Sequence, residues 1–509
     1  MKNQSLLKIL ALMVLALAVG LVGCEGDEGP AGPAGPEGPE GPEGPQGPPG
    51  EGAEISEYAY VGGAGDVCAH CHASVVEDMS HTGHADAYDM GDPAALENPY
   101  CLQCHTTGWD RPASYGSDDW MTADNPDTSG FDDYFGQTDA VSVERMALLE
   151  GVQCESCHGP MGPEFDHAPL LSFATMDTHD PENITAADIT SPCYPCHSTQ
   201  FEGPDHDFTG GYATSGHASV AGGDLDALNA EHYAHVGSCQ PCHTSEGFIA
   251  ANDPAFADYS FGHTVNFIGC VTCHDPHVGE EGAEHSAQLR NVGPATLAYS
   301  YPYEPDDAEA PTMDGYENGQ LCAQCHKARR DNANVAGQIA NGYAHFGPHH
   351  SAQADMFIGY GSYEIPGYDY DDGRTHLHQN VTQACVDCHM VRETELHGET
   401  QDYAFHNFVP EISTNCAGCH GASFTETDVD DYQATIVALM DELAVDFGYT
   451  DYHDMEENWD STAEGVQEWE RESAYAMFFI IGDGSLGVHN PMYAEELLNN
   501  AIDYYNDKK

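Results

Sequence analysis

Positively charged residues are scarce in this chain. It holds 13 Lys and Arg against 85 Asp and Glu in 509 residues, which gives a formal net charge of −72. Such a surface repels nucleic acid and anionic lipid headgroups, so both are excluded as partners. It favours solubility, cationic partners and metal ions. Carboxylates that repel one another this strongly suggest a saline habitat, where salt screens them.

Apolar residues are also few. They make up 40% of the chain, and only 4 residues are Trp, so a core of side chains alone would be thin. We therefore expect another group to fill part of it. No Gly-rich phosphate loop, Ser-His-Asp arrangement or nucleotide fingerprint occurs, which leaves no signature of nucleotide-dependent or serine-hydrolase chemistry.

One short apolar run, Ile9 to Gly23, follows the positive charges of Lys2 and Lys8. It is too short for a comfortable membrane span, and residues 1–23 are predicted to be a signal peptide. The run ends in Leu-Val-Gly-Cys at residues 21–24, which resembles the lipobox of bacterial lipoproteins. The resemblance implies that Cys24 carries lipid and anchors the mature chain. The alternative is an ordinary signal peptide with an incidental cysteine.

Residues 24–54 form a separate segment. Glycine recurs at every third position from Gly26, with proline beside it in most triplets. This is the collagen pattern, because only glycine fits at the axis of three chains. The segment is interpreted either as a short triple helix in a homotrimer or as a single extended stalk. Either form separates the remainder from the anchor by roughly 70 Å.

The chemistry is carried by a motif, Cys-x-x-Cys-His, that occurs nine times and uses eighteen of the 19 cysteines. The nine copies are Cys68/Cys71/His72, Cys101/Cys104/His105, Cys154/Cys157/His158, Cys193/Cys196/His197, Cys239/Cys242/His243, Cys270/Cys273/His274, Cys322/Cys325/His326, Cys385/Cys388/His389 and Cys416/Cys419/His420.

Two cysteines at this spacing form thioethers to the vinyl groups of one haem, and the adjoining histidine becomes the proximal ligand of its iron. Zinc sites and disulfides do not require a histidine after every pair. We therefore predict nine covalently bound haems c. Of the 30 histidines, nine lie in motifs and 21 remain, enough to give every iron a second imidazole. Ligation by two imidazoles predicts low reduction potentials.

The Gly-His-Ala segments at His84 and His217 resemble distal-ligand segments of the multihaem cytochromes that include the nitrite reductases, cytochrome c554 and octahaem enzymes. That resemblance covers roughly residues 60–505 and implies a loop-rich, mostly helical fold with stacked haems. Together with position relative to the motifs, it nominates nine distal ligands: His84, His167, His217, His235, His277, His349, His378, His406 and His489. Their substitutes are His232, His263, His345, His350 and His376.

The predicted fold is mostly α-helical with much irregular loop and a haem-filled core. Residues 55–425 would form the cytochrome domain, and residues 426–509 a helical tail packed on it. Apolar spacing in the tail predicts helices at residues 428–447, 461–481 and 492–505. The acidic loop of Asp369, Asp371, Asp372 and Gly373 is a candidate Ca²⁺ site, although it matches no EF-hand. A solvated acidic loop is the favoured alternative.

The leading functional hypothesis is electron transfer through a chain of haems at the outer membrane or surface of a bacterium. Its partners would be other redox proteins or extracellular electron acceptors. The alternative is a reductase of small nitrogen or sulfur oxyanions with one open haem, near the polar residues His349, His350, Gln353 and Asp355. No Cys-x-x-Cys-Lys occurs, which argues against a nitrite-reductase-like centre. A filament of stacked subunits is a third possibility, which a lipid anchor disfavours.

Overall fold

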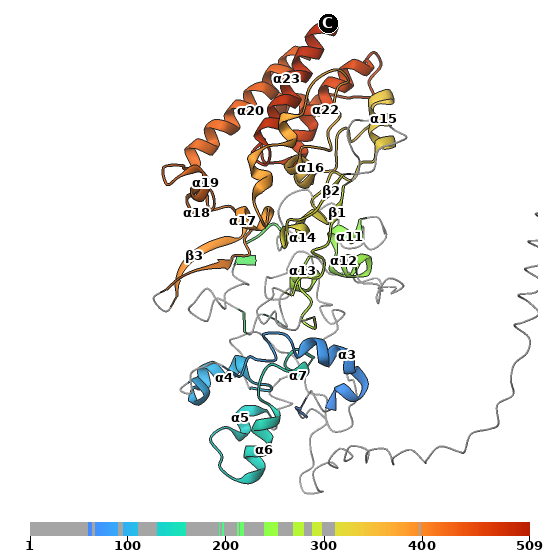
Figure 1. The fold of residues 1–509 in the computed structure, drawn as a ribbon. Helices are drawn as coiled ribbons and strands as arrows, with labels where there is room; N and C mark the ends of the chain where they lie inside the picture. Colours follow the sequence, from blue (N-terminus) through green and yellow to red (C-terminus); the bar gives the residue numbers. More distant parts are fainter. Residues whose placement is uncertain are drawn as a thin grey trace, which may run out of the picture. The chain divides into compact units, whose positions relative to one another are not determined.

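The computed structural model describes residues 60–63, 67–89, 95–109, 130–158, 193, 196–197, 211–212, 214–217, 239–252, 268–278, 288–297, 311–396 and 399–509 (Figure 1). The chain divides into two compact units, residues 1–54 and residues 55–509. All the described residues belong to the second unit. The predicted signal peptide, Cys24 and the Gly-Pro stalk lie outside them.

The first described part consists of short helices around a small apolar cluster. The helices are α3 (Ala69–Met79), η1 (Ala95–Glu97), α4 (Pro99–His105), α5 (Phe131–Tyr134), α6 (Ala140–Leu148) and α7 (Cys154–His158). Local sequence explains two of their starts. The Asn98 side chain accepts from a backbone N–H at the start of α4, and Asp139 accepts from two at the start of α6. Tyr60, Leu102, Phe131 and Leu149 form the cluster.

The middle of the chain combines short helices with two small antiparallel sheets. Its elements are α11 (Gln240–His243), α12 (Ser245–Asn252), α13 (Cys270–Cys273), β1 (Ala295–Thr296), β2 (Thr312–Met313), α14 (Gly319–Ala323), α15 (Asn332–Asn341), α16 (Gln353–Ile358), η5 (Asp372–Arg374), η6 (Leu377–Asn380), α17 (Cys385–His389), β3 (Val391–Leu396), β4 (Glu399–Ala404), α18 (Ile412–Asn415) and α19 (Ala417–His420). Strand β1 pairs with β2, and β3 pairs with β4.

The chain ends in four helices, α20 (Glu426–Asp446), α21 (Tyr452–Asn458), α22 (Glu468–Asp483) and α23 (Pro491–Lys508), of which α20, α22 and α23 are the longest described. Their apolar faces share one core with α15, α16 and the segment 363–370. Met440, Phe479 and Leu498 are fully or almost fully buried in it. The last helices are therefore built into the same body as residues 328–370, and the predicted division at residue 425 stays a prediction.

The predicted helices at residues 428–447 and 492–505 are confirmed within a few residues. The one predicted from residue 461 is wrong at its start, because α22 begins only at Glu468. The Ser461 hydroxyl donates to the carbonyl of Tyr343 at 2.8 Å and accepts from its N–H at 2.9 Å. Arg471 donates to the carbonyls of Ser461 and Val466. These bonds to loop backbone hold residues 461–467 outside the helix.

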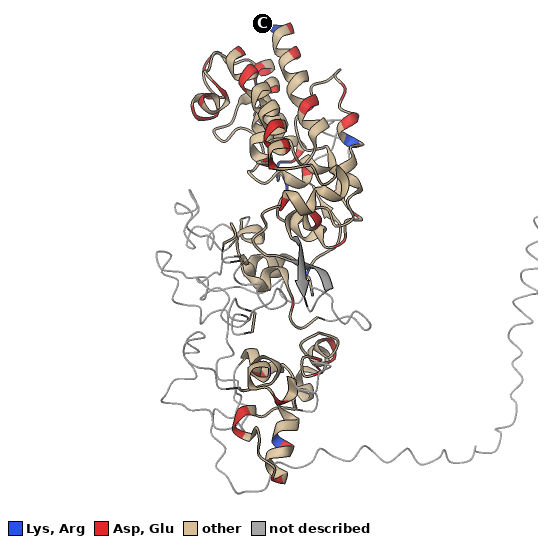
Figure 2. Ribbon diagram, turned by 90° about the vertical axis from the view of Figure 1, so that its left-hand side faces the viewer, with Lys and Arg blue, Asp and Glu red and all other residues tan. Residues whose placement is uncertain are grey.

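The predicted mostly helical class with irregular connections is confirmed. Figure 2 shows Asp and Glu spread along the described helices, with Lys and Arg at few places. Among the described residues, no helix combines the length and apolar character needed to cross a lipid bilayer.

Candidate haem-binding site

Eight of the nine motifs are described at every position, and each of these folds as one helical turn. Where the pattern is complete, the N–H of the motif histidine donates to the carbonyl of the first cysteine, as in His72 to Cys68 at 2.9 Å and His326 to Cys322 at 2.9 Å. Such a turn puts both sulfurs on one side, because residues three apart in a helix share a face. The eighteen motif cysteines, all of which the structure describes, form no disulfides. Their geometry suits two thioethers to one haem.

Seven motif histidines lie opposite one of the nominated distal histidines. The pairs are His84–His197, His158–His277, His217–His326, His243–His349, His274–His406, His378–His420 and His389–His489. The members of each pair come from distant parts of the sequence, so only the tertiary fold brings them together.

The spacing within these pairs is nearly constant. The ring centroids lie between 5.9 Å and 6.1 Å apart, whereas the angle between the rings varies from 8° to 73°. If the two imidazole rings of a pair touched directly, the distance between their centroids would change with the angle between them. Two metal–imidazole bonds of about 2 Å each, added to the two ring radii, come to about 6 Å. The residues therefore fit a haem iron between each pair.

His72 and His105 are the motif histidines outside these seven pairs. The two nominated ligands that remain, His167 and His235, lie outside the described residues. His105 contacts the carbonyl of Ala87 through Nδ1. The distal ligands of the first two motifs therefore stay predictions.

Hydrogen bonds on Nδ1 orient several of the paired rings. His389 donates to the carbonyl of Phe408 at 2.9 Å, and His378 donates to that of Val488 at 3.1 Å. A proton held on Nδ1 leaves Nε2 as the atom that binds a metal. The surrounding backbone thus selects the tautomer that haem ligation needs.

Burial keeps several of these imidazoles neutral. It lowers the pKa of His217 to about 4, helped by the neighbouring His326. The pKa of His349 is also lowered to about 4, first by burial and then by the charge of Arg329. A metal ligand must be deprotonated on the binding nitrogen. At neutral pH these rings are therefore ready to bind iron without losing a proton.

His489 has a different environment. Its Nδ1 lies 2.6 Å from Oδ1 of Asp483, whose side chain is fully buried. Burial lowers and the Asp483 carboxylate raises the pKa of His489, and the net shift is upward. Asp483 was not predicted from the sequence. It ends a run of mostly apolar helix residues, and no local pattern shows that it contacts a histidine in the following loop.

Gln353 and Asp355, two of the polar residues nominated around an open iron, have partners of their own. Gln353 accepts from Nδ1 of His326 at 3.2 Å and donates to the carbonyl of Asp483 at 2.8 Å. The carboxylate of Asp355 accepts from the N–H of Ala328 at 2.7 Å, and His350 is exposed. Gln353 therefore supports a proximal ligand, and Asp355 supports the backbone just after a motif.

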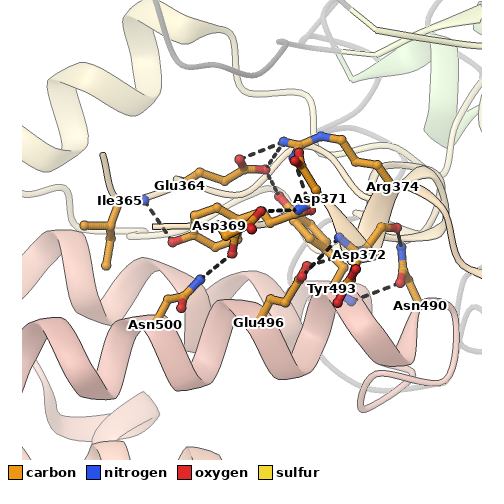
Figure 3. Close-up of polar contacts among 12 residues, drawn as sticks. Glu364, Ile365, Asp369, Asp371, Asp372, Arg374, Asn490, Tyr493, Glu496 and Asn500 are labelled. Carbon is orange, nitrogen blue, oxygen red and sulfur yellow. Dashed lines mark hydrogen bonds and ion pairs between the residues drawn. The ribbon is translucent and has the colours of Figure 1, made fainter. Parts of the chain in front are cut away.

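The acidic loop nominated for Ca²⁺ makes hydrogen bonds to α23 and within itself (Figure 3). Glu496 accepts from the N–H groups of Asp372 and Gly373 at 3.1 Å and 3.0 Å, and Asp369 accepts from the N–H of Asp371 at 3.0 Å. No three His, Cys, Asp or Glu side chains converge on a metal position anywhere in the described part of the chain. The Ca²⁺ site therefore stays a prediction. Of the nominated aspartates, Asp369 accepts from the backbone of the loop and Asp371 lies 3.8 Å from Arg374.

Cysteines of different motifs lie against one another. The contacting thiols are Cys68–Cys154, Cys193–Cys270, Cys242–Cys325 and Cys322–Cys385. Further pairs, within electrostatic range, are Cys157–Cys193, Cys273–Cys322 and Cys388–Cys416. The Cys196 sulfur is 4.0 Å from the carbonyl of Cys104.

These contacts order the motifs in space. Numbered along the sequence, the order is first, third, fourth, sixth, seventh, eighth and ninth. The second motif lies beside the fourth, and the fifth lies beside the seventh. The main order follows the sequence, and only the second and fifth motifs leave it to lie at its side. The spacing of the motifs along the chain could not have given these two positions.

The motif cysteines differ in their exposure. Cys71, Cys388 and Cys419 are exposed, whereas the other fifteen are partly buried. Cys71 and Cys419 belong to the first and ninth motifs, which end the order of contacts and have a neighbouring motif on one side only. Thioether bonds at all eighteen motif cysteines stay predictions.

The histidines of the two end motifs share this exposure. Both His72 and His420 are exposed. His420 still faces the nominated His378, and the centroid of the Phe424 ring lies 4.4 Å from that of His420.

Two families of haem proteins match different parts of the chain. The family described as cytochrome c552 matches residues 360–509, and the family described as cytochrome c554 and c-prime matches residues 67–125 and 129–159. The first match contains the last two motifs, and the second contains the first three.

Among curated proteins, the chain is similar to the multiheme cytochrome MtrA of Shewanella baltica (strain OS185). They are 27% identical over 138 residues, which are 25% of this chain and 37% of that protein. The chain thus spans little more than a third of its relative.

Two solved structures are also similar. Outer cell wall cytochrome OcwA is 16% identical, with 88% of this chain and 99% of that chain covered and a TM-score of 0.47. An undecaheme cytochrome from the S-layer of Carboxydothermus ferrireducens is 18% identical, with 89% and 70% covered and a TM-score of 0.44. The repeated motifs and the matches to haem-protein families identify the chain as a multihaem c-type cytochrome with covalently bound haem c.

Proposed function

We propose that this protein conducts electrons through nine haems, each held by a motif histidine and a second histidine. The proposal is carried by the seven histidine pairs at a spacing of 5.9 Å to 6.1 Å. An iron with two protein ligands has no position for a substrate, so its chemistry is the gain and loss of an electron. The nominated His167 and His235 supply the second ligands for the first two motifs.

The contacts between motifs support a route for these electrons. Haems whose thioether cysteines touch lie close to each other, as at Cys322 and Cys385. The route runs from the first motif through the third, fourth, sixth, seventh and eighth to the ninth. The second and fifth haems join it at the fourth and seventh. Two side entries allow electrons to enter or leave at more than two places.

The exposed end motifs are the proposed terminals of this route. Cys71 and Cys419 face solvent, so the first and ninth haems would present an edge to an electron donor or acceptor. Electron exchange between proteins requires such an edge, because a redox partner must approach the haem closely.

Electron paramagnetic resonance of the oxidised full-length protein tests the proposed function. Nine low-spin haems are the expected result, counted against total haem from a pyridine haemochrome assay. A high-spin ferric signal that binds nitrite or hydroxylamine would overturn it in favour of the alternative, a reductase of small nitrogen or sulfur oxyanions with one open haem.

We further propose that the chain is exported and held at the outer membrane or cell surface by lipid on Cys24. The signal-like residues 1–23 and the Leu-Val-Gly-Cys ending support this. Labelling cells with a radioactive fatty acid is expected to mark the protein, and Cys24→Ser is expected to abolish the label. An unlabelled protein would overturn the lipid anchor.

The surface of this protein is suited to cationic partners. With a net charge of −72, it attracts positively charged faces of redox proteins and mineral acceptors, and its association is expected to weaken as salt increases.

The Gly-Pro stalk is proposed to join three chains. Sedimentation of the soluble protein with and without residues 24–54 checks this, since a monomer in both cases contradicts the trimer.

A further inference from the structure

Asp483 is the last residue of α22, and its side chain is fully buried. Oδ1 lies 2.6 Å from Nδ1 of His489. Oδ2 accepts from the Ser485 hydroxyl and, at 3.2 Å, from the Ser485 N–H. Both oxygens of the carboxylate are therefore held in place, with one aimed at the imidazole.

Neutral acceptors serve other paired histidines in the described part of the chain. They are the carbonyls of Phe408 and Val488, the Ser351 hydroxyl and the Gln353 amide. Asp275 lies near His277, but the two are 3.5 Å apart and His277 is 43% exposed. Arg290, at 2.7 Å, also neutralises Asp275. The contact of Asp483 is thus shorter and more deeply buried.

We propose that Asp483 is a positioning residue that lowers the reduction potential of the haem bound to Cys385, Cys388 and His389. A hydrogen bond to a carboxylate makes the imidazole a stronger electron donor to its metal. The buried negative charge also stabilises ferric over ferrous iron, because the ferric centre carries one more positive charge. Both effects have the same sign. The inference rests on the proposed function, since it takes His389 and His489 as ligands of one iron.

The same support reaches the neighbouring haem. Gln353 accepts from Nδ1 of His326 and donates to the main-chain carbonyl of Asp483. The proximal ligand of the seventh motif and the distal ligand of the eighth are thus tied to one residue of α22. The eighth haem becomes a low-potential step between the seventh and ninth, so electrons reside mainly on its neighbours.

A potentiometric titration of the full-length holoprotein, followed by haem absorbance, tests the proposal. Asp483→Asn keeps the shape and an acceptor but removes the charge. In this variant, about one ninth of the absorbance change, the part due to one haem, is expected to occur at higher potential. The low-spin signals in electron paramagnetic resonance are expected to persist. Asp483→Glu is expected to retain the low potential. Ser351→Ala, the matched control, removes a neutral acceptor at His349 and is expected to leave the potential of the eighth haem unchanged.

Two further variants separate the possible failures. His489→Ala is expected to convert one haem to high spin. If its low-spin signals all persist, His489 is not a ligand and the proposed function fails at this haem. If it turns high-spin while Asp483→Asn shifts no potential, the inference alone is overturned. Should Asp483→Asn fail to accumulate, Ser485→Ala frees Oδ2 from a donor and is expected to lower the same potential. The absence of a shift in Ser485→Ala would then overturn the inference.

Discussion

At the scale of single residues, the histidine pairs carry the function. A motif histidine is fixed by its cysteines, but its partner comes from a segment far along the chain. The partner of His326, for example, is His217. His217 also packs against Phe408, with the ring centroids 4.7 Å apart. In the folded chain, the distal ring is therefore packed against an aromatic neighbour as well as facing its partner histidine.

Removal of one distal ring should open one iron. His217→Gly is expected to convert one haem from low to high spin, and added imidazole is expected to restore the low-spin signal by filling the space left behind. Electron paramagnetic resonance with and without imidazole measures both. His453→Gly is the control, because that side chain is 69% exposed and its neighbours Tyr452 and Glu456 lie in the same helix. An unchanged spectrum in His217→Gly contradicts its role as a ligand.

Asp355 gives a pH dependence of stability. Burial raises the pKa of this carboxyl from 3.8 to about 7. The folded state therefore binds a proton more tightly than the unfolded state. This contribution is fully present below pH 4 and is lost as the pH rises through 7. A pKa difference of this size corresponds to roughly 4 kcal/mol at most.

Asp355→Asn should remove this dependence. The variant is expected to gain stability relative to the wild type as the pH rises from 5 to 8, since an amide can still accept from the Ala328 N–H. Thermal unfolding followed by circular dichroism at both pH values measures the gap. A gap that stays constant would show that the carboxyl is ionised throughout this range.

At the scale of elements, one buried polar network joins the segment 363–374 to α23 (Figure 3). Glu364 accepts from Arg374 at 2.6 Å and from the Tyr493 hydroxyl at 2.8 Å. Asn490 caps α23 and donates to the carbonyl of Gly373. His489 precedes Asn490, and His378 follows the same segment. The network thus positions two nominated ligands.

Loss of Arg374 should be costly. Arg374→Met leaves the buried Glu364 carboxylate without its cation and is expected to destabilise the fold by about 3–5 kcal/mol. The double variant Glu364→Gln with Arg374→Met is expected to recover part of this loss. Denaturant unfolding of the holoproteins measures both. Equal stability of the single and double variants would contradict an unpaired charge as the cause.

At the scale of the whole molecule, haem is part of the core. Nine motifs fall between residues 68 and 420 of a chain with only 40% hydrophobic residues. The described helices around the motifs are short, whereas the well-packed apolar cluster lies with α20, α22 and α23. Binding of haem must therefore supply much of the folding free energy of the remainder.

Production without haem attachment should expose this dependence. In cells that lack the machinery for c-type haem attachment, residues 55–327 are expected to be digested rapidly by protease. The C-terminal helices and the segment 328–370 that packs with them are expected to be digested more slowly. Limited proteolysis with mass spectrometry identifies the fragments. A fully protected apo-protein would show that side chains alone build the fold.

The sequence alone determined the cofactor, because Cys-x-x-Cys-His is a local pattern and one helical turn suffices to form it. It also predicted the last helices, whose apolar spacing is local. The late start of α22 was missed because Ser461 is held by Tyr343, more than a hundred residues earlier. The tertiary structure alone decided which histidines face each other, which motifs are neighbours, that Cys71 and Cys419 are exposed and that Asp483 meets His489. These properties depend on how distant segments meet, and no spacing along the chain encodes them.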